Sequence, residues 1–301
     1  MELSDKKFAV LIDADNISHR KIKDILDEIA NYGTPTIKRI YGDFTDPKFA
    51  AWKSVLLENS ITPIQQYAYT TGKNATDSAL IIDAMDILHK ESVNGFCIVS
   101  SDSDYTRLAS RIRESGREVL GFGEKKTPKP FIKSCDKFIY VEILGQPAPA
   151  PAPVSAPAQT AAAVPAAKAA TPKKTAKKHQ GRNAPETDMP EAATAEHAAA
   201  EKKVAPAPDT AQPQPIIRPI DDDFKTLLAN TIEDAADDSG WAFLGIVGGV
   251  LTKKMPDFDP RNYGYKKLSL LVKSLSKIVE IEERPSENKE LKLVYVRNRI
   301  R

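Results

Sequence analysis

The sequence is poor in cysteine and has no long hydrophobic segment. Its only cysteines are Cys97 and Cys135, too few for a disulfide framework or a four-cysteine metal site. This favours a reducing compartment, and we expect a cytoplasmic protein. The first apolar run soon meets acidic residues, and no run approaches the roughly eighteen apolar residues of a membrane-spanning helix. The sequence therefore indicates neither a signal peptide nor a membrane span.

The chain also lacks a strong net charge, and a long internal segment lacks aromatic residues. The formal net charge is only +2, so the total indicates no general affinity for polyanions. Residues 146–217 contain no Phe, Trp or Tyr but thirteen of the 22 prolines. Such a segment buries too little apolar surface to offset the entropy cost of ordering it. The sequence thus predicts a folded domain at 1–145, a disordered Ala/Pro/Lys linker at 146–217 and a second folded domain at 218–301.

Short β-branched segments alternate with segments of helical period in residues 1–145. This alternation is typical of an α/β fold, in which helices flank a parallel sheet. Strands are predicted at Phe8–Asp13, Thr36–Tyr41, Ile61–Gln66, Phe96–Ser100, Glu118–Phe122 and Phe138–Val141. Helices are predicted at Ser18–Tyr32, which begins with a Ser18 cap and stops at Gly33, and at Pro47–Asn59, Thr76–Lys90 and Tyr105–Ser115.

Acidic residues stand where such a sheet carries its functional groups. Open α/β sheets bind ligands beyond the carboxyl ends of their strands, where the strand order reverses. Asp13 ends the first predicted strand, and Asp102 and Asp104 follow the fourth. Asp77 begins the third predicted helix, on the same stripe as its apolar residues. A carboxylate on a buried face costs several kcal/mol unless a cation or hydrogen bonds compensate it.

Each of these acids alone also fits a structural role, as a helix cap, a partner of a helix dipole or a turn former. Together they call for a different explanation, because like charges in one pocket repel each other. Carboxylate oxygens are the hard ligands that Mg²⁺ and Mn²⁺ prefer. The sequence therefore predicts a site for Mg²⁺ or Mn²⁺ formed by Asp13, Asp77, Asp102 and Asp104.

Four segments of the first domain carry the residues discussed above: DADN at 13–16, ATDSALIID at 75–83, VSSDSDYTRLASRIRESG at 99–116 and CDKFIYVE at 135–142. Together they resemble the NYN domains, PIN-like nucleases of the LabA-like branch. The resemblance implies a PIN-like α/β fold and a metal-dependent ribonuclease. The family more often has Phe where this chain has Tyr105.

The resemblance also assigns roles to individual residues. It implies metal-binding carboxylates at the same four aspartates, with Asn16 as a neighbouring polar residue. Asp15 fills a variable position and is expected to be structural or to support a ligand. Asp83 occupies an acidic position of the family, although the helical pattern places it off the buried stripe, so it is an additional candidate.

Such a cluster suits phosphodiester hydrolysis, in which one or two ions activate a water and stabilise the charge of the transition state. Asp13 and Asp102 are expected to be the primary ligands, while Asp77 and Asp104 hold a second ion or orient the water. Lysines in nearby loops are expected to bind the RNA phosphates on either side of the cleaved bond, although they equally fit ordinary solvated positions. These lysines are Lys73, Lys125, Lys126 and Lys129.

The second domain has the pattern of a winged helix. In a helix around residue 271, apolar residues would occupy one face, opposite a stripe of Lys266, Lys273 and Lys277 that suits contact with phosphates. Two strands are predicted at Val279–Glu283 and Leu291–Arg297. Gly240-Trp241, DFDPRNYGYKKL and this wing resemble the OST-HTH or LOTUS domain, which implies binding of RNA, here single-stranded RNA, or in some members a protein partner.

Two alternatives remain open on the sequence. The hydrophobic segment followed by DADNI also resembles the start of haloacid-dehalogenase phosphatases, in which the first Asp, here Asp13, is a nucleophile. The lysine and the cap insertion of that family are not identifiable here. The other alternative is a non-catalytic RNA-binding adaptor with an idle acidic pocket.

Overall fold

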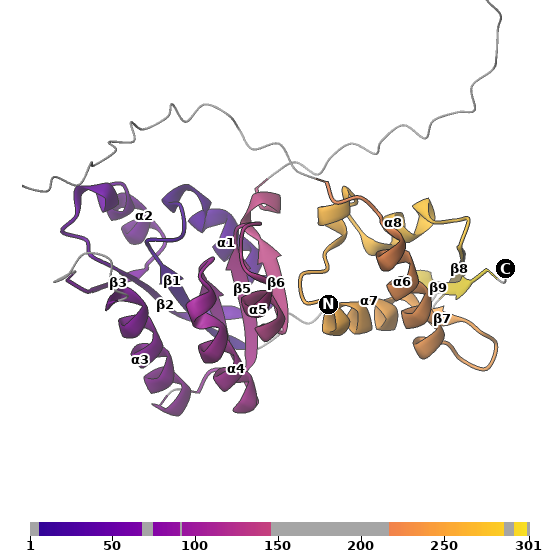
Figure 1. The fold of residues 1–301 in the computed structure, drawn as a ribbon, viewed down its shortest axis with the longest axis horizontal. Coiled ribbons are helices and arrows are strands. Elements are labelled where there is room, and N and C mark those ends of the chain that lie inside the picture. Colours follow the sequence, from indigo (N-terminus) through magenta and orange to yellow (C-terminus); the bar gives the residue numbers. More distant parts are fainter. Residues whose placement is uncertain (1–5, 68–74, 91, 146–216, 286–291, 300–301) are drawn as a thin grey trace, which may run out of the picture. The chain divides into compact units, whose positions relative to one another are not determined.

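The computed structural model of the chain describes residues 6–67, 75–90, 92–145, 217–285 and 292–299. The predicted linker, except its last residue, and Lys73 lie outside these ranges. Figure 1 shows the helices and strands of the two folded domains. Within the described ranges, no helix combines the length and the apolar character needed to cross a membrane.

The first domain is a parallel six-stranded sheet, which confirms the predicted α/β class. Its strand order is β3-β2-β1-β4-β5-β6, and all neighbouring pairs are parallel. The order reverses between β1 and β4, so the carboxyl ends of these two strands flank the place where open α/β sheets bind ligands. The strands are β1 (Lys7–Asp13), β2 (Thr34–Gly42), β3 (Thr62–Gln65), β4 (Gly95–Val99), β5 (Glu118–Gly123) and β6 (Lys137–Tyr140).

Helices cover both faces of this sheet (Figure 1). One buried cluster joins α1 and α2 to the sheet, and a second joins α3, α4 and α5 to its other face. The helices are α1 (Ile22–Ile29), α2 (Trp52–Glu58), α3 (Ala75–Lys90), α4 (Thr106–Glu114) and α5 (Lys129–Ser134). Short 3-10 turns are η1 (His19–Lys21), η2 (Pro47–Phe49), η3 (Ser103–Tyr105) and η4 (Val141–Ile143).

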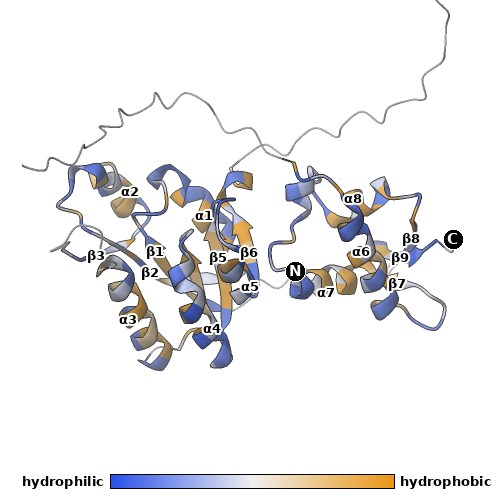
Figure 2. Cartoon of the chain, in the orientation of Figure 1, coloured by the Kyte–Doolittle hydropathy of each residue, from blue (hydrophilic) through white to orange (hydrophobic). Residues whose placement is uncertain are grey.

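The side chains of β1 alternate between the two faces of the sheet. Phe8, Val10 and Ile12 pack with α1 and α2, whereas Ala9 and Leu11 pack with α3 and α4. All five are fully buried, as expected of a central parallel strand, and Figure 2 shows hydrophobic and hydrophilic residues interspersed along the covering helix α3. Because successive side chains of a strand point to opposite faces, Asp13 continues the series that faces α3 and α4.

Three local features differ from the sequence prediction. The first helix is shorter than expected, because the 3-10 turn η1 precedes it and the Ser18 side chain makes no cap hydrogen bond. Gly33 was predicted as the stop of this helix, but the structure explains the glycine by close packing, since a Cβ there would lie 2.4 Å from the Lys6 carbonyl oxygen. Helix α5 was not predicted, because it has only six residues, one of them Pro130, and so carries too little periodic signal.

The second domain has the predicted combination of helices and a β-wing. Its antiparallel sheet has the order β7-β9-β8, and Leu228, Val247 and Val296 are fully buried in its core. The two-residue strand β7 was too short to predict. The elements are α6 (Asp222–Ala235), β7 (Ala242–Phe243), α7 (Leu244–Lys254), η5 (Pro260–Tyr263), α8 (Leu268–Ser274), β8 (Val279–Pro285) and β9 (Lys292–Asn298).

The predicted lysine stripe does not lie on one helix. Helix α8 begins only after Lys267, whose backbone is extended at φ −142°, and it ends at Ser274. Lys266 and Lys277 therefore flank the helix, and only Lys273 belongs to it. Lys273 is also engaged, because its Nζ lies 2.9 Å from Glu283 Oε1. The predicted stripe was wrong because it assumed helical spacing at Lys266 and Lys277, which lie outside α8.

Candidate active site

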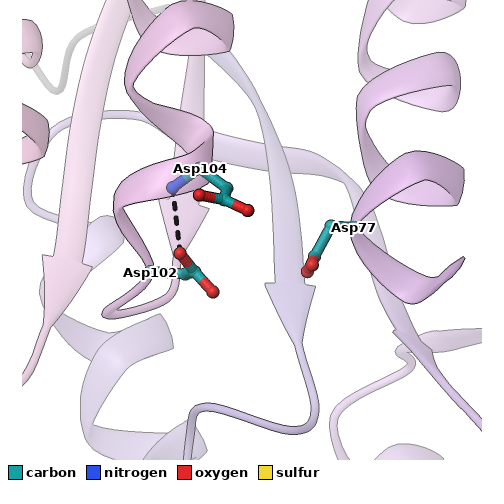
Figure 3. Close-up of side chains that lie close together, drawn as sticks. All are labelled: Asp77, Asp102 and Asp104. Atoms are coloured by element: carbon teal, nitrogen blue, oxygen red, sulfur yellow. Dashed lines mark hydrogen bonds between the residues drawn. The ribbon is translucent and has the colours of Figure 1, made fainter. Parts of the chain in front are cut away.

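Three carboxylates converge at the carboxyl edge of the sheet. Asp77 lies in the first turn of α3, whereas Asp102 and Asp104 belong to the segment after β4. One oxygen from each of the three lies within 4.8 Å of the others. Figure 3 shows the Asp77 carboxylate facing those of Asp102 and Asp104 from a separate helix. The structure therefore brings together three of the four aspartates that the sequence proposed as ligands.

The segment after β4 is held in place by its own hydrogen bonds. The Asp102 carboxylate caps the 3-10 turn η3, because its Oδ1 accepts a hydrogen bond of 2.9 Å from the Asp104 amide. The Asp102 amide in turn donates to Ser100 Oγ at 3.0 Å. Asp102 thus has a structural role, which leaves its second oxygen, Oδ2, outside the capping bond.

Asp13 lies beside this cluster but is fully buried and differently engaged. Its Oδ1 accepts a hydrogen bond from the Asp15 amide at 3.0 Å. Its Oδ2 accepts bonds from Asn16 Nδ2 at 2.6 Å and Ser100 Oγ at 2.8 Å. Asp13 is therefore a hub that ties the loop after β1 to the end of β4, with Asn16 as its immediate neighbour, as the family resemblance implied.

Tyr105 connects Asp13 to the three converging carboxylates. Its hydroxyl donates to Asp77 Oδ1 at 2.6 Å and lies 3.4 Å from Asp13 Oδ2. The ring is fully buried. In the sequence, Tyr105 stood out only because the family more often has Phe at this position. The extra hydroxyl of tyrosine was the feature that could have indicated this contact.

The electrostatics of the site disfavour carboxylate charge when no cation is present. Burial raises the pKa of Asp13, and hydrogen bonds from Asn16 and Ser100 only partly offset the effect. The pKa of Asp77 is raised by burial and, in addition, by the negative charges of Asp102 and Asp104, against a lowering hydrogen bond from Tyr105. Burial and the neighbouring carboxylates also raise the pKa of the Tyr105 hydroxyl, so Tyr105 acts as a neutral donor.

The converging carboxylates fit a small divalent cation. The donors are all oxygens, as Mg²⁺ prefers, and its bonds of about 2.0–2.1 Å put ligand atoms roughly 3 to 4 Å apart. Oxygens that already lie within 4.8 Å of one another need to move only slightly to reach such spacing. The raised pKa of Asp77 has the sign expected of a pocket whose negative charge a cation would balance.

These pKa shifts predict how a cation changes stability with pH. A carboxyl whose pKa is higher in the folded state stabilises the protein below the unfolded value of 3.8, and this stability is lost as pH rises through the folded pKa. A cation binds the charged form, so Mn²⁺ should raise the thermal midpoint most at neutral pH and less as pH falls toward the raised pKa of Asp77. Thermal unfolding with and without Mn²⁺ between pH 5 and 8 measures this difference, and a Mn²⁺ effect that stays constant with pH contradicts the assignment.

Asp83, the additional candidate, is not part of the cluster. Its two carboxylate oxygens accept hydrogen bonds from the Arg39 guanidinium and the Tyr41 hydroxyl on strand β2. This contact explains the half-buried carboxylate, which the helical pattern had placed off the apolar stripe. The sequence carries no sign of the pairing, because Arg39 and Tyr41 are distant in the chain.

Three of the four lysines predicted to contact RNA phosphates in the first domain lie within the described residues. Lys125 and Lys126 lie in the loop after β5, which is joined to the site because the Glu124 amide donates to Ser101 Oγ at 2.9 Å. Lys126 Nζ pairs with Glu124 at 2.8 Å, and Lys129 is exposed at the start of α5. A further lysine, which the sequence reading missed, is Lys48, whose Nζ lies 2.8 Å from Asp15 Oδ1.

Comparison with known proteins finds relatives among solved structures. A solution NMR structure of an uncharacterized protein of Nitrosomonas europaea is 35% identical, with 34% of this chain and 94% of that chain covered and a TM-score of 0.26. A crystal structure of a protein of unknown function from Vibrio parahaemolyticus is 20% identical, with 46% and 96% covered and a TM-score of 0.39. No curated protein matches the chain.

Two family models match the two folded domains. The NYN domain matches residues 7–143, which include the whole acidic cluster. The OST-HTH/LOTUS domain matches residues 215–291, which include the helices of the second domain. NYN is a PIN-like nuclease family, and OST-HTH/LOTUS is an RNA-binding domain. The chain therefore contains an NYN domain at residues 7–143, followed by an OST-HTH/LOTUS domain at residues 215–291.

Proposed function

We propose that the protein is a Mg²⁺- or Mn²⁺-dependent ribonuclease that hydrolyses phosphodiester bonds of single-stranded RNA. The observation that carries the proposal is the convergence of Asp77, Asp102 and Asp104 within 4.8 Å, at the strand-order reversal of an NYN domain. A bound cation would activate water and stabilise the charge that develops on the phosphoryl group. The three carboxylates would hold that cation.

The remaining residues of the site have supporting roles. Asp13 holds Asn16 and Ser100 through its Oδ2, and the Tyr105 hydroxyl fixes the orientation of Asp77 Oδ1. A network of this kind keeps ligand side chains in one rotamer, which lowers the cost of organising the site. The exposed lysines Lys126, in the loop after β5, and Lys129, at the start of α5, would contact phosphates that flank the cleaved bond.

The second domain supplies a second RNA contact in this proposal. A binding domain on the same chain raises the effective concentration of substrate at the first domain, by an amount set by the connecting segment. The resemblance also implies a protein partner in some members of the family, so binding of a protein is the competing role for this domain.

The phosphatase alternative is disfavoured by the environment of Asp13. A nucleophilic carboxylate must reach a phosphoryl group, but Asp13 is 0% exposed and both of its oxygens accept hydrogen bonds. A phosphatase of that kind would be trapped by beryllofluoride and would hydrolyse small phosphomonoesters. We expect neither result for this protein.

Cation dependence tests the proposed function directly. Purified full-length protein should cut single-stranded RNA with Mg²⁺ or Mn²⁺, lose the activity in EDTA and recover it when either cation is returned. Gel analysis of labelled RNAs of varied sequence measures the cleavage. If the protein binds these RNAs but leaves them intact with both cations, the non-catalytic adaptor is the better description.

A further inference from the structure

We propose that the outer face of the β-wing binds unpaired RNA bases by stacking. This arginine–aromatic face consists of Trp241, Phe243, Arg284, Tyr295 and Arg297. The inference rests on the proposed function, because it takes single-stranded RNA as the substrate, and it adds a location and a mode of contact in the second domain. No residue of this face was among the sequence-predicted RNA contacts, which were all lysines.

The strand register places these side chains on one side of the sheet. Val296 is fully buried in the domain core, so its neighbours Tyr295 and Arg297 point to the opposite, outer face. Tyr295 pairs across the sheet with Phe243 of β7 on one side and Glu282 of β8 on the other. Phe243 and Tyr295 are half-buried and in contact, with ring centroids 5.7 Å apart.

The two arginines lie over the aromatic rings. The Arg284 guanidinium carbon is 4.3 Å from the Tyr295 centroid and 5.2 Å from the Trp241 centroid. The Arg297 guanidinium carbon is 4.6 Å from the Trp241 centroid. Both arginine side chains remain accessible, with 35% and 40% of their surfaces exposed. The face therefore presents a continuous set of planar groups to solvent.

The carboxylates beside the arginines indicate which ligand suits this face. Glu282 binds Arg284 at 3.0 Å and Glu280 binds Arg297 at 2.8 Å, in each case through an N–H at the edge of the guanidinium. A phosphate that approached either arginine would be repelled by the negative charge of the neighbouring carboxylate. A nucleobase instead stacks on the flat side of an arginine or an aromatic ring and leaves the ion pairs intact.

The backbone holds Trp241 firmly in this arrangement. The Asp237 carboxylate accepts a hydrogen bond from the Trp241 amide at 3.1 Å, and the Asp237 amide donates to the Trp241 carbonyl at 2.9 Å. Gly240 closes this turn with its backbone at φ +79°, a conformation that residues other than glycine rarely adopt. A preformed stack of this kind costs little ordering entropy when a base is added.

Tryptophan fluorescence tests the proposal in the full-length protein. Asp102→Asn is used as the background so that the RNA is not consumed, and a short single-stranded RNA of mixed sequence is the probe. We expect the RNA to quench the emission in this background and to leave the emission of a variant that also carries Trp241→Phe nearly unchanged. The same sequence as a blunt RNA duplex, or inorganic polyphosphate, should quench far less because neither presents free bases.

A pair of arginine substitutions separates stacking from charge. Arg284→Lys keeps the positive charge but removes the planar group, and should weaken binding of a fluorescently labelled single-stranded RNA about tenfold, near the contribution of one stacked base. Arg299→Lys is the matched control, because Arg299 is exposed immediately after β9, and it should bind as the parent does. Thermal unfolding of each variant checks that the second domain remains folded.

Several outcomes would overturn this inference. Equal quenching by polyphosphate and by single-stranded RNA, or unchanged affinity in Arg284→Lys, would assign binding to charge alone. RNA binding without any change at Trp241 would place the RNA contact elsewhere and leave this face to a protein partner. Because the readout does not depend on cleavage, a failure of the nuclease proposal would leave quenching at Trp241 intact, and the two failures are therefore distinguishable.

Discussion

Asp102→Asn is expected to lower RNA cleavage by about 10³-fold or more while the fold survives. A cation that is lost from the site removes several kcal/mol of transition-state stabilisation, and about 4 kcal/mol corresponds to that factor. Asn retains a side-chain oxygen that can cap η3 by accepting the Asp104 amide, as Asp102 Oδ1 does. The substitution thus removes the charge of a ligand without removing the cap.

A matched pair on helix α3 makes the same test independent of that cap. Asp77→Asn should also abolish cleavage, because Asp77 belongs to the converging group. Asp86→Asn is the control, since Asp86 lies exposed on the same helix and, among the residues that the structure describes, pairs with Lys90 at 2.9 Å. Such a surface pair contributes at most about 1 kcal/mol, so this variant should cleave normally.

Calorimetric titration with Mn²⁺ supplies the measurement that links these variants to the cation. Asp102→Asn and Asp77→Asn should bind Mn²⁺ much more weakly than the parent, and Asp86→Asn should bind it equally. If all three variants bound Mn²⁺ as the parent does, the carboxylate cluster would not be the cation site. A cleavage loss with normal Mn²⁺ binding would instead indicate that these residues orient the substrate.

The sheet was predictable because its physical signal is local. Each strand of the first domain is a short β-branched segment, and all six were placed within about two residues of their observed bounds. The position of Asp13 follows from the same alternation, since it continues the series of Ala9 and Leu11 toward α3. Acids at the ends of β1 and β4 meet because the strand order reverses there.

The finer structure of the site depends on contacts that no local pattern encodes. Tyr105 reaches Asp77 from a segment 28 residues away, and Arg39 reaches Asp83 across 44 residues. The division of roles among the four acids was likewise not predictable, because it depends on the burial of Asp13 and on its hydrogen-bond donors. The lysine stripe failed for a related reason, since periodicity does not state where α8 begins and ends.

Asp13→Asn is expected to separate stability from activity. The raised pKa shows that the folded environment disfavours the Asp13 charge, so a neutral isostere should leave stability at neutral pH unchanged or improve it. The Asn side chain still offers an oxygen to the Asp15 amide. Its new NH₂ group, however, would face the donors that now bind Oδ2, so Asn16 and Ser100 must reorient.

The cost of this reorientation should appear in the cleavage rate. Loss of a residue that orients ligands typically costs about 10- to 100-fold, which is less than the loss expected for Asp102→Asn. Asp13→Ala is the contrasting variant, because it leaves buried donors without an acceptor at about 1–3 kcal/mol each and opens a cavity. Thermal unfolding and cleavage of both variants measure the effects. A cleavage loss in Asp13→Asn as large as that of Asp102→Asn would assign Asp13 to the primary ligands, as first expected from the sequence.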